Sequence, residues 1–350
     1  MDTVNVFFRK CSPESIEKVK RRVVQCLLDH KVMHKFRYQG YFMIAVDGTG
    51  VHSYDYEPWV GCPYRTSKKG KTTWLVNVVE AKLVCSNGFA ISLGTEWIKN
   101  GGDMDKQDCE RKAFIRLSER LKKDFPRLPI LILADGLYPY EKAFEICENN
   151  GWQYMFTFKD GNLKTVWEEV EDELLINQKN KKSHFLCRTA DHVCIQNIQW
   201  VNGLTYKSFH LNWIECLEID TNKGNTKETR FVHLASLLVN DDNAVHISRY
   251  ARMRWKIENE GFNTQKNGGY HLEHKFSRLN FTAMQNYYQC MQIAHIINQL
   301  AENELSFQKK LHQKDSIDTV WSWIIAALMF VCFDDDFVAE IYKSNCQLRY

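Results

Sequence analysis

The chain has 350 residues, of which 44% are hydrophobic and 25% are charged, proportions typical of a soluble globular protein. The formal net charge of +3 permits nucleic acid as a partner without requiring it, since only clustered basic residues would form a binding surface. The 12 cysteines are scattered and form no Cys-x-x-Cys pair. In a chain with no expected signal peptide, this argues against a disulfide framework and predicts a cytosolic protein with reduced thiols.

Residues 1–40 are expected to form an N-terminal basic helical segment. Ser12 followed by Pro13 is a typical helix start, because a capping residue precedes a proline in the first turn, and a helix is expected over 13–31. This helix carries the basic run "EKVKRR", and a second basic run, "RTSKKGK", lies at 65–71. Such runs either follow a phosphate backbone or form ordinary solvated surface.

Residues 41–159 alternate between apolar strands and helices, and they are interpreted as the first part of a domain. The second and third strands are joined by "SNG", a β-hairpin signal. The expected strands are 41–47, 72–85, 89–98, 129–134 and 152–158, and the expected helices are 106–123 and 139–149. A right-handed crossover helix would return the fourth strand parallel to the first. The order βββαβαβ predicts an α/β fold with a mixed sheet flanked by helices.

Residues 160–238 interrupt this alternation with short strand-like pieces and turn signals, which predicts a β-rich insertion. The insertion contains "HFLCRTADHVC", whose histidines and cysteines either bind zinc or alternate along ordinary strands. A helix expected over 242–266 then begins the remainder of the domain, residues 239–305.

A C-terminal helical segment, residues 306–350, is expected to follow. Its apolar run at 321–333 is too short to span a bilayer, so it predicts a buried helix and no association with a membrane.

Two acidic residues directly follow apolar strands. "YFMIAVDGTG" contains Asp47, and "LPILILADGLYP" contains Asp135. Asp before Gly is a common turn device, which is one interpretation of each pair. If the first and fourth strands are adjacent, however, the two carboxylates lie side by side and repel each other unless a cation sits between them. Hard oxygen ligands favour magnesium or manganese.

A third acid is expected from the helix over 242–266. Glu258 and Glu260 point about 200° apart on an α-helix, so one of them faces the sheet. Glu258 lies on the apolar side with Trp255, which makes it the metal-ligand candidate and leaves Glu260 to the solvent. Arg254 lies one turn before Glu258, where its guanidinium either holds a phosphate or pairs with Glu258 itself.

Three segments, in this order and with a β-rich insertion before the last, resemble the DDE transposases of bacterial insertion sequences: "AVDGTG", "LADGLYP" and "RMRWKIENEGFNTQKNGGYHLEH". The resemblance covers residues 40–305. It implies a ribonuclease H-like catalytic domain in which Asp47, Asp135 and Glu258 hold two Mg²⁺ ions, for which Mn²⁺ can substitute.

The same resemblance implies a cut-and-paste reaction on DNA. One ion would activate water, and later the transposon 3′-hydroxyl, while the other would stabilise the leaving oxygen. The implied partner is double-stranded DNA, both transposon ends and target, bound by a homodimer that works at the nucleoid in the cytoplasm.

The helix motif of related transposases is Tyr-x2-Arg-x3-Glu-x6-Lys. Arg254 and Glu258 match it, whereas Tyr250 and Lys266 are each displaced by one position. Together with Arg252 of the basic run "RYARMRWK", these residues are the candidates for DNA phosphate binding. Only 46 residues precede Asp47, fewer than a separate sequence-specific DNA-binding region usually takes. Either the first predicted helix does this work in reduced form, or the chain is a truncated derivative.

Two other functions share these features. A nuclease on the same fold would use the same acids for hydrolysis without strand transfer, and a catalytically silent DNA-binding remnant would need only the basic residues. The insertion favours transposition, because a simple nuclease does not need it. Its aromatic residues Trp200 and Trp213 either stack on a displaced base or belong to the core.

Overall fold

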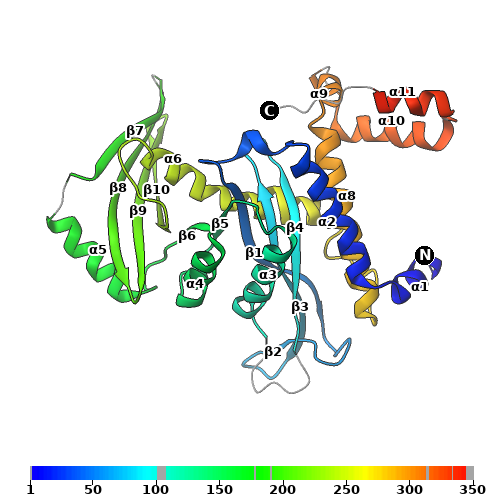
Figure 1. Ribbon diagram of the computed structural model, residues 1–350, viewed down its shortest axis with the longest axis horizontal. Coiled ribbons are helices and arrows are strands. Elements are labelled where there is room, and N and C mark those ends of the chain that lie inside the picture. The colour runs from blue at the N-terminus through cyan, green and yellow to red at the C-terminus, as the bar shows by residue number, and fades with distance from the viewer. Residues whose placement is uncertain are drawn as a thin grey trace. The chain divides into compact units, whose positions relative to one another are not determined.

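The computed structural model describes residues 2–100, 108–176, 179–189, 191–312, 315–332 and 334–343 (Figure 1). The chain divides between Gln289 and Cys290 into two compact units. The first unit is built on a ten-stranded mixed sheet. Its strands are β1 (Phe42–Tyr54), β2 (Tyr64–Thr66), β3 (Thr72–Val84), β4 (Ala90–Ile98), β5 (Ile130–Ala134), β6 (Gln153–Thr157), β7 (Lys181–Arg188), β8 (His192–Tyr206), β9 (Phe209–Asn222) and β10 (Asn225–Ala235).

The helices of the first unit cover this sheet or connect its strands. They are α1 (Asp2–Lys10), α2 (Pro13–Asp29), α3 (Glu110–Asp124), α4 (Glu141–Asn150), α5 (Lys164–Ile176), α6 (Ala244–Ala251) and α7 (Thr264–Asn267), with 3₁₀ turns η1 (His34–Phe36) and η2 (Arg252–Arg254) and a π-helical segment η3 (Ile257–Asn263). Helix α8 (Phe281–Glu302) begins in this unit.

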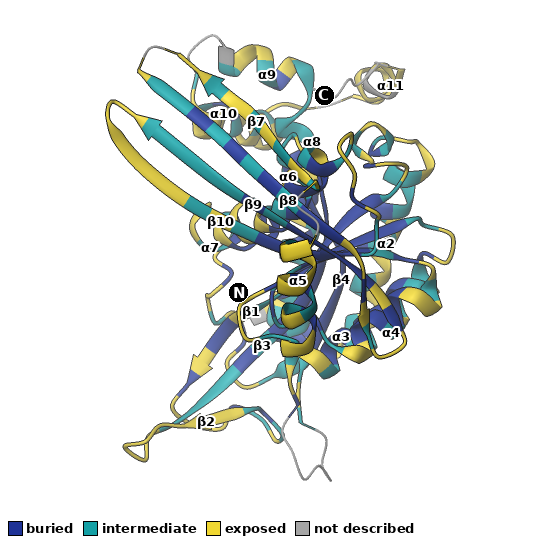
Figure 2. Ribbon diagram, turned by 90° about the vertical axis from the view of Figure 1, so that its left-hand side faces the viewer, coloured by how far each residue is buried: buried dark blue, intermediate teal, exposed yellow. Residues whose placement is uncertain are grey.

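The sheet order is β2-β3-β1-β5-β6-β10-β9-β8-β7, and β4 also pairs with β3. The predicted hairpin is confirmed, since β3 and β4 are antiparallel. The predicted parallel pairing of the first and fourth strands is confirmed as well, since β1 and β5 are parallel neighbours. Residues 42–46 of β1 and the whole of β5 are buried in the middle of the sheet (Figure 2), which explains their uninterrupted apolar sequences.

The expectation that the first strand ends at Asp47 is wrong. Strand β1 loses its partner β5 after Val46, but it continues antiparallel to β3 as far as Tyr54. Residues 48–54 look like a loop in the sequence because they contain two glycines and several polar residues. The ladder with β3 keeps them extended, so Asp47 lies inside a strand rather than at its end.

The β-rich character of the predicted insertion is confirmed. Its last strand, β10, pairs antiparallel with β6, so β7 to β10 extend the central sheet on the β6 side. The histidines and cysteines of "HFLCRTADHVC" lie on β7 and β8, and His192 bonds to Asp220. Trp200 and Trp213 are buried in the core, so the idea that they stack on a displaced base is wrong.

Different helices pack on the two faces of the sheet. Leu117 and Leu121 of α3 lie against Gly94 of β4 on one face. On the other face, Lys20 of α2 is fully buried and donates hydrogen bonds to Ser92 and Thr95. The predicted N-terminal helix is therefore confirmed as a helix.

Part of its basic run faces the protein. Arg21 of the same helix pairs with Asp124 at 2.5 Å. Two of the run's four cations are thus engaged within the first unit.

The second unit contains α9 (Leu305–His312), α10 (Ile317–Phe330) and α11 (Asp335–Lys343). The helix predicted from the apolar run at 321–333 is confirmed by α10, but the expectation that it is buried is wrong for much of its length. Trp323, Leu328 and Phe330 are all exposed. Among the described residues, the helices are too short or too polar to cross a membrane.

Candidate active site

Asp47 and Asp135 lie side by side, as the parallel pairing of their strands predicts. The last register pair of β1 and β5 is Val46 with Ala134, and the two aspartates follow immediately on their respective strands. Strand β5 ends there, which opens the sheet next to Asp47. The two carboxylates therefore sit at a break in the sheet where a ligand can approach them.

Each aspartate is held by one backbone amide and one cation. Oδ1 of Asp47 accepts from the Gly48 amide at 2.9 Å, and Oδ2 lies 2.8 Å from Nη1 of Arg254. Oδ1 of Asp135 accepts from the Leu137 amide at 2.8 Å, and Oδ2 lies 3.3 Å from Nζ of Lys159. The alternative in which Arg254 pairs with Glu258 is therefore not the arrangement observed, and Lys159 is a cation that the sequence pattern did not single out.

A fourth acid, Glu110, belongs to this group and was missed in the sequence. It is the first residue of α3, and its Oε1 accepts from the hydroxyl of Tyr138 at 2.9 Å. In the sequence, an acid in the first turn of a helix is ordinary, because it favours the positive end of the helix dipole. The one available signal was its position at the start of the crossover helix between the hairpin and Asp135, and that signal is weak.

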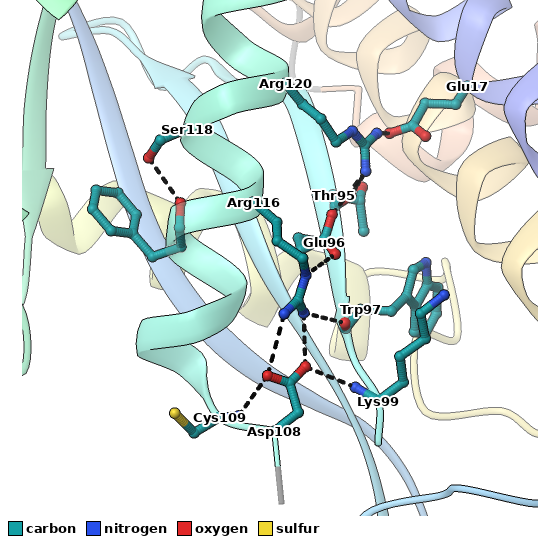
Figure 3. Close-up of polar contacts among 11 residues, drawn as sticks. Glu17, Thr95, Glu96, Trp97, Lys99, Asp108, Cys109, Arg116, Ser118 and Arg120 are labelled. Atoms are coloured by element: carbon teal, nitrogen blue, oxygen red, sulfur yellow. Dashed lines mark hydrogen bonds and ion pairs between the residues drawn. The ribbon is translucent and has the colours of Figure 1, made fainter. Parts of the chain in front are cut away.

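The start of α3 is fixed by two arginines (Figure 3). Arg116 binds both oxygens of Asp108, at 2.7 and 3.3 Å, and also Glu96 at 2.7 Å. Arg120 bonds to Glu96 and to Glu17 of α2. Asp108 precedes Glu110 by two residues and also accepts from the Lys99 amide. Because these contacts tie α3 to β4, they fix the backbone that carries Glu110.

Both Asp-Gly pairs use glycine to admit a neighbouring side chain. Neither Gly48 nor Gly136 has a positive φ, so neither is needed for a left-handed turn. A Cβ on Gly48 would lie 2.6 Å from Oε2 of Glu110, and a Cβ on Gly136 would lie 2.6 Å from Cδ of Lys159. The turn interpretation holds in part for Asp135, whose carbonyl accepts from the Tyr138 amide.

Two carboxyls of this group, those of Asp47 and Glu110, have a raised pKa. Burial raises the pKa of Asp47 to about 6, and the charges of Asp135 and Glu258 add to the increase while Arg254 opposes it. Burial also raises the pKa of Glu110, with further contributions from Asp47 and Asp135. The site therefore concentrates more negative charge than its own cations offset, which is the condition under which a bound cation is stabilised.

Glu258 reaches this group from a different position than expected. The helix predicted over 242–266 is broken into α6, η2, η3 and α7, and Glu258 lies in the π-helical segment. The expectation of an inward apolar face is wrong, since Glu258 and Trp255 are exposed. The π segment carries more residues per turn than an α-helix, so the 100° spacing no longer applies. Glu260, expected in solvent, is half-buried and pairs with Lys256 at 2.6 Å.

The remaining candidates for phosphate binding are engaged by other partners. The ring of Tyr250 packs on Tyr38, with centroids 4.3 Å apart. Arg252 pairs with Glu218 at 2.8 Å and Lys266 pairs with Glu273 at 3.1 Å. Of the four residues selected in the sequence, the structure brings Arg254 alone into contact with one of the two aspartates.

The carboxylate oxygens of this site are the type of ligand that hard divalent ions such as Mg²⁺ prefer, and they carry excess negative charge. Asp47, Asp135 and Glu258 would hold such ions, and Glu110 is the further carboxylate within range. In the arrangement observed, no three acidic, histidine or cysteine residues of the described segments converge closely enough to form a ligand cluster. Arg254 and Lys159 occupy one oxygen of each aspartate instead.

A cleft of about 670 Å³ opens beside Asp135. Lys159, Arg254, Trp255 and His233 contribute to its lining. The guanidinium of Arg254 lies 4.8 Å from the centre of the Trp255 ring. Burial, and then the charges of Arg252 and Arg254, lower the pKa of His233 to about 3, so its imidazole is neutral near pH 7. Both cations that hold the aspartates therefore face a space that an anionic substrate could enter.

Comparison with known proteins does not identify the chain. No protein-family model matches it, and no curated protein matches it. Among solved structures, the NurA nuclease from Sulfolobus solfataricus aligns over 86% of this chain and 96% of its own, with 10% sequence identity and a TM-score of 0.27. This similarity is too low to assign a fold or an activity.

Proposed function

We propose that this chain cleaves phosphodiester bonds of DNA with the help of divalent metal ions, and that it does so as a DDE-type transposase. The observation that carries the proposal is the adjacency of Asp47 and Asp135 at the end of β5, together with two further acids near them. The charge of Glu258 adds to the raised pKa of Asp47, and the charges of Asp47 and Asp135 add to the raised pKa of Glu110. Such a group of acids costs stability unless it binds a cation, and structural residues alone do not need it.

Bound divalent ions supply a nucleophilic oxygen at neutral pH and stabilise the negative charge on the leaving oxygen. The chain's own residues do the rest. Arg254 and Lys159 neutralise the aspartates in the free protein, and both also line the adjacent cleft. When a substrate phosphate enters, it offers these cations a second anion, and the planar guanidinium of Arg254 suits bidentate binding of phosphate oxygens.

The assignment to transposases rests on the resemblance of the three sequence segments and on the β-rich segment between Asp135 and Glu258. Within this proposal the substrate is double-stranded DNA, both transposon ends and target, and the active form is a homodimer on DNA at the nucleoid. Hydrolysis and strand transfer use the same acids, so the geometry of the site supports phosphodiester cleavage but does not distinguish the two reactions. The joining step is proposed from the sequence resemblance.

The test is a cleavage and joining assay with supercoiled plasmid, a labelled oligonucleotide with a free 3′-hydroxyl, and Mg²⁺ or Mn²⁺. Asp47→Asn, Asp135→Asn and Glu258→Gln should each abolish metal-dependent nicking and joining. Glu260→Gln is the matched control, because Glu260 lies two residues from Glu258 and pairs with Lys256 instead of facing the aspartates.

Each outcome selects one function. Joined products that disappear in the three variants support transposition, whereas nicking without joining supports the nuclease alternative. DNA binding without cleavage in either metal supports the silent remnant. Full activity in Asp135→Asn would refute a catalytic role for this group of acids.

A further inference from the structure

The basic run at 65–71 forms a projection at one end of the sheet. Strand β2 and the turn that follows it pair with the first residues of β3, and both views place β2 at the far end of the β1–β3 pair (Figures 1 and 2). We refer to residues 64–71 as the basic prong.

All four cations of the prong are exposed. Arg65, Lys68, Lys69 and Lys71 are fully on the surface, and no acidic residue lies between positions 64 and 71. None of the four forms an ion pair with any residue that the structure describes. The other basic runs are different, because they have Lys20 buried and Arg21, Arg252 and Arg254 paired with acids. Within the described part of the chain, the prong is thus a concentration of charge that is not neutralised by ion pairs.

The prong has a defined conformation. The hydroxyls of Thr66 and Thr72 are 3.1 Å apart, and the Ser67 amide donates to the carbonyl of Lys71 at 2.9 Å. Gly70 has a φ of +80°, which permits the tight turn between them. Because the backbone is already ordered, the four cations are presented to a partner without a large loss of chain entropy on binding.

The register of the sheet gives the distance between the prong and the candidate site. Asp47 pairs with Glu80 on β3, and the prong pairs with β3 at Thr72, eight residues earlier. At about 3.4 Å per residue this separation is about 27 Å along the strand. A DNA duplex rises about 3.4 Å per base pair, so the same length corresponds to about eight base pairs.

We propose that the basic prong binds the phosphate backbone of duplex DNA about eight base pairs away from the phosphate at the candidate site. This inference rests on the proposed function, because it takes the position of the cut phosphate from Asp47 and Asp135. The prong carries no base-reading arrangement of side chains, so its contribution is independent of sequence and decreases with salt.

The experiment measures binding of two DNA hairpins, with about 5 and about 24 base pairs, by fluorescence anisotropy between about 50 and 200 mM salt. The test variant is Arg65→Gln/Lys68→Gln/Lys69→Gln/Lys71→Gln. The control variant, Lys18→Gln/Arg22→Gln/Lys123→Gln/Arg127→Gln, removes the same number of exposed charges from α2, the end of α3 and the turn after it. Thermal melting followed by circular dichroism shows whether each variant is folded.

The prong variant should bind the 24-base-pair duplex roughly tenfold or more weakly at 50 mM salt, with a salt slope smaller by about 0.9 for each DNA phosphate that the prong no longer neutralises. Its binding to the 5-base-pair duplex should match that of the wild type, because this duplex, about 17 Å long, does not reach from the site to the prong. The control variant should lose less affinity and show no such dependence on length.

Equal binding of wild type and prong variant to the longer duplex would overturn this inference, as would an equal loss on both lengths. Neither result bears on catalysis, since the proposed function fails separately, when Asp47→Asn still cleaves DNA. A wild-type protein that binds no duplex at all would overturn both.

Discussion

Gly48→Ala tests whether the position of the Glu110 carboxylate matters for activity. The new Cβ would lie 2.6 Å from Oε2 of Glu110, and ordinary contact begins at 3.4 Å, so the carboxylate has to move by about 0.8 Å (3.4 − 2.6). Misplacement of a catalytic group by about 1 Å can reduce a rate by about 100-fold. We therefore expect DNA cleavage by Gly48→Ala to fall by about 10- to 100-fold.

The same substitution should hardly change stability. Gly48 has no positive φ, so alanine fits the backbone, and its smaller unfolded-state entropy is worth roughly 0.4–1 kcal/mol in favour of folding. The displaced atoms are the far end of a flexible side chain, which can move at little cost. The combination of a lower rate with an unchanged or slightly higher melting temperature separates loss of position from loss of fold.

Gly50→Ala is the matched control, because it lies on the same strand and its new Cβ would meet Asn77 at an ordinary 3.4 Å. The assay is single-turnover nicking of supercoiled plasmid with Mg²⁺, together with thermal melting. A Gly48→Ala/Glu110→Asp variant should recover part of the activity, since the shorter side chain leaves room for the methyl group. Wild-type activity in Gly48→Ala, while Glu110→Gln is inactive, would refute the positional argument.

Three other predictions concern stability. Because the pKa of Asp47 is raised from 3.8 to about 6, the folded protein holds this proton longer than the unfolded chain, so its contribution to the free energy of unfolding falls as pH rises from about 4 to 6. In chelator, Asp47→Asn should remove about 2 kcal/mol of this pH-dependent loss, measured as the difference between urea unfolding at pH 4.5 and 7.5. An unchanged pH slope would contradict the assignment. Lysine in place of Arg116 cannot bind both oxygens of Asp108 and Glu96 at once. Arg116→Lys should therefore lower the free energy of unfolding by about 2 kcal/mol and increase hydrogen exchange at the start of α3. Unchanged exchange there would show that the contacts of Arg116 with Asp108 and Glu96 do not anchor Glu110. Lys20→Met removes a buried cation next to Glu80, Ser92 and Thr95. It should lower the free energy of unfolding in urea by about 3 kcal/mol. A neutral or stabilising effect would mean that packing alone holds α2 on the sheet.

The sequence was sufficient to predict the centre of the sheet. The apolar runs before Asp47 and Asp135 are long enough to specify buried strands, and the intervening helix forces them to be parallel neighbours. From this pairing the adjacency of the two aspartates follows directly, and the register of β1 with β5 agrees with it.

The rest of the site depends on contacts that leave little trace in a sequence. Glu110 resembles any acid in a first helical turn, and its role becomes visible through its contact with Gly48 across the sheet. The orientation of Glu258 depends on a π-helical segment, which has no clear sequence signal. Lys159 follows β6 in an ordinary loop, and its partner Asp135 comes from a neighbouring strand.

The departures from ordinary local structure converge on one place. Glycine is unfavourable inside a strand, a buried group of acids is unfavourable without a cation, and a π-helical segment is less stable than an α-helix. Here Gly48, the acids around Asp47 and the segment carrying Glu258 all occur at the same break in the sheet. A chain under selection for stability alone would have no reason to combine them, since each can be replaced by a more stable alternative. Their coincidence favours a site whose charge and geometry serve a substrate.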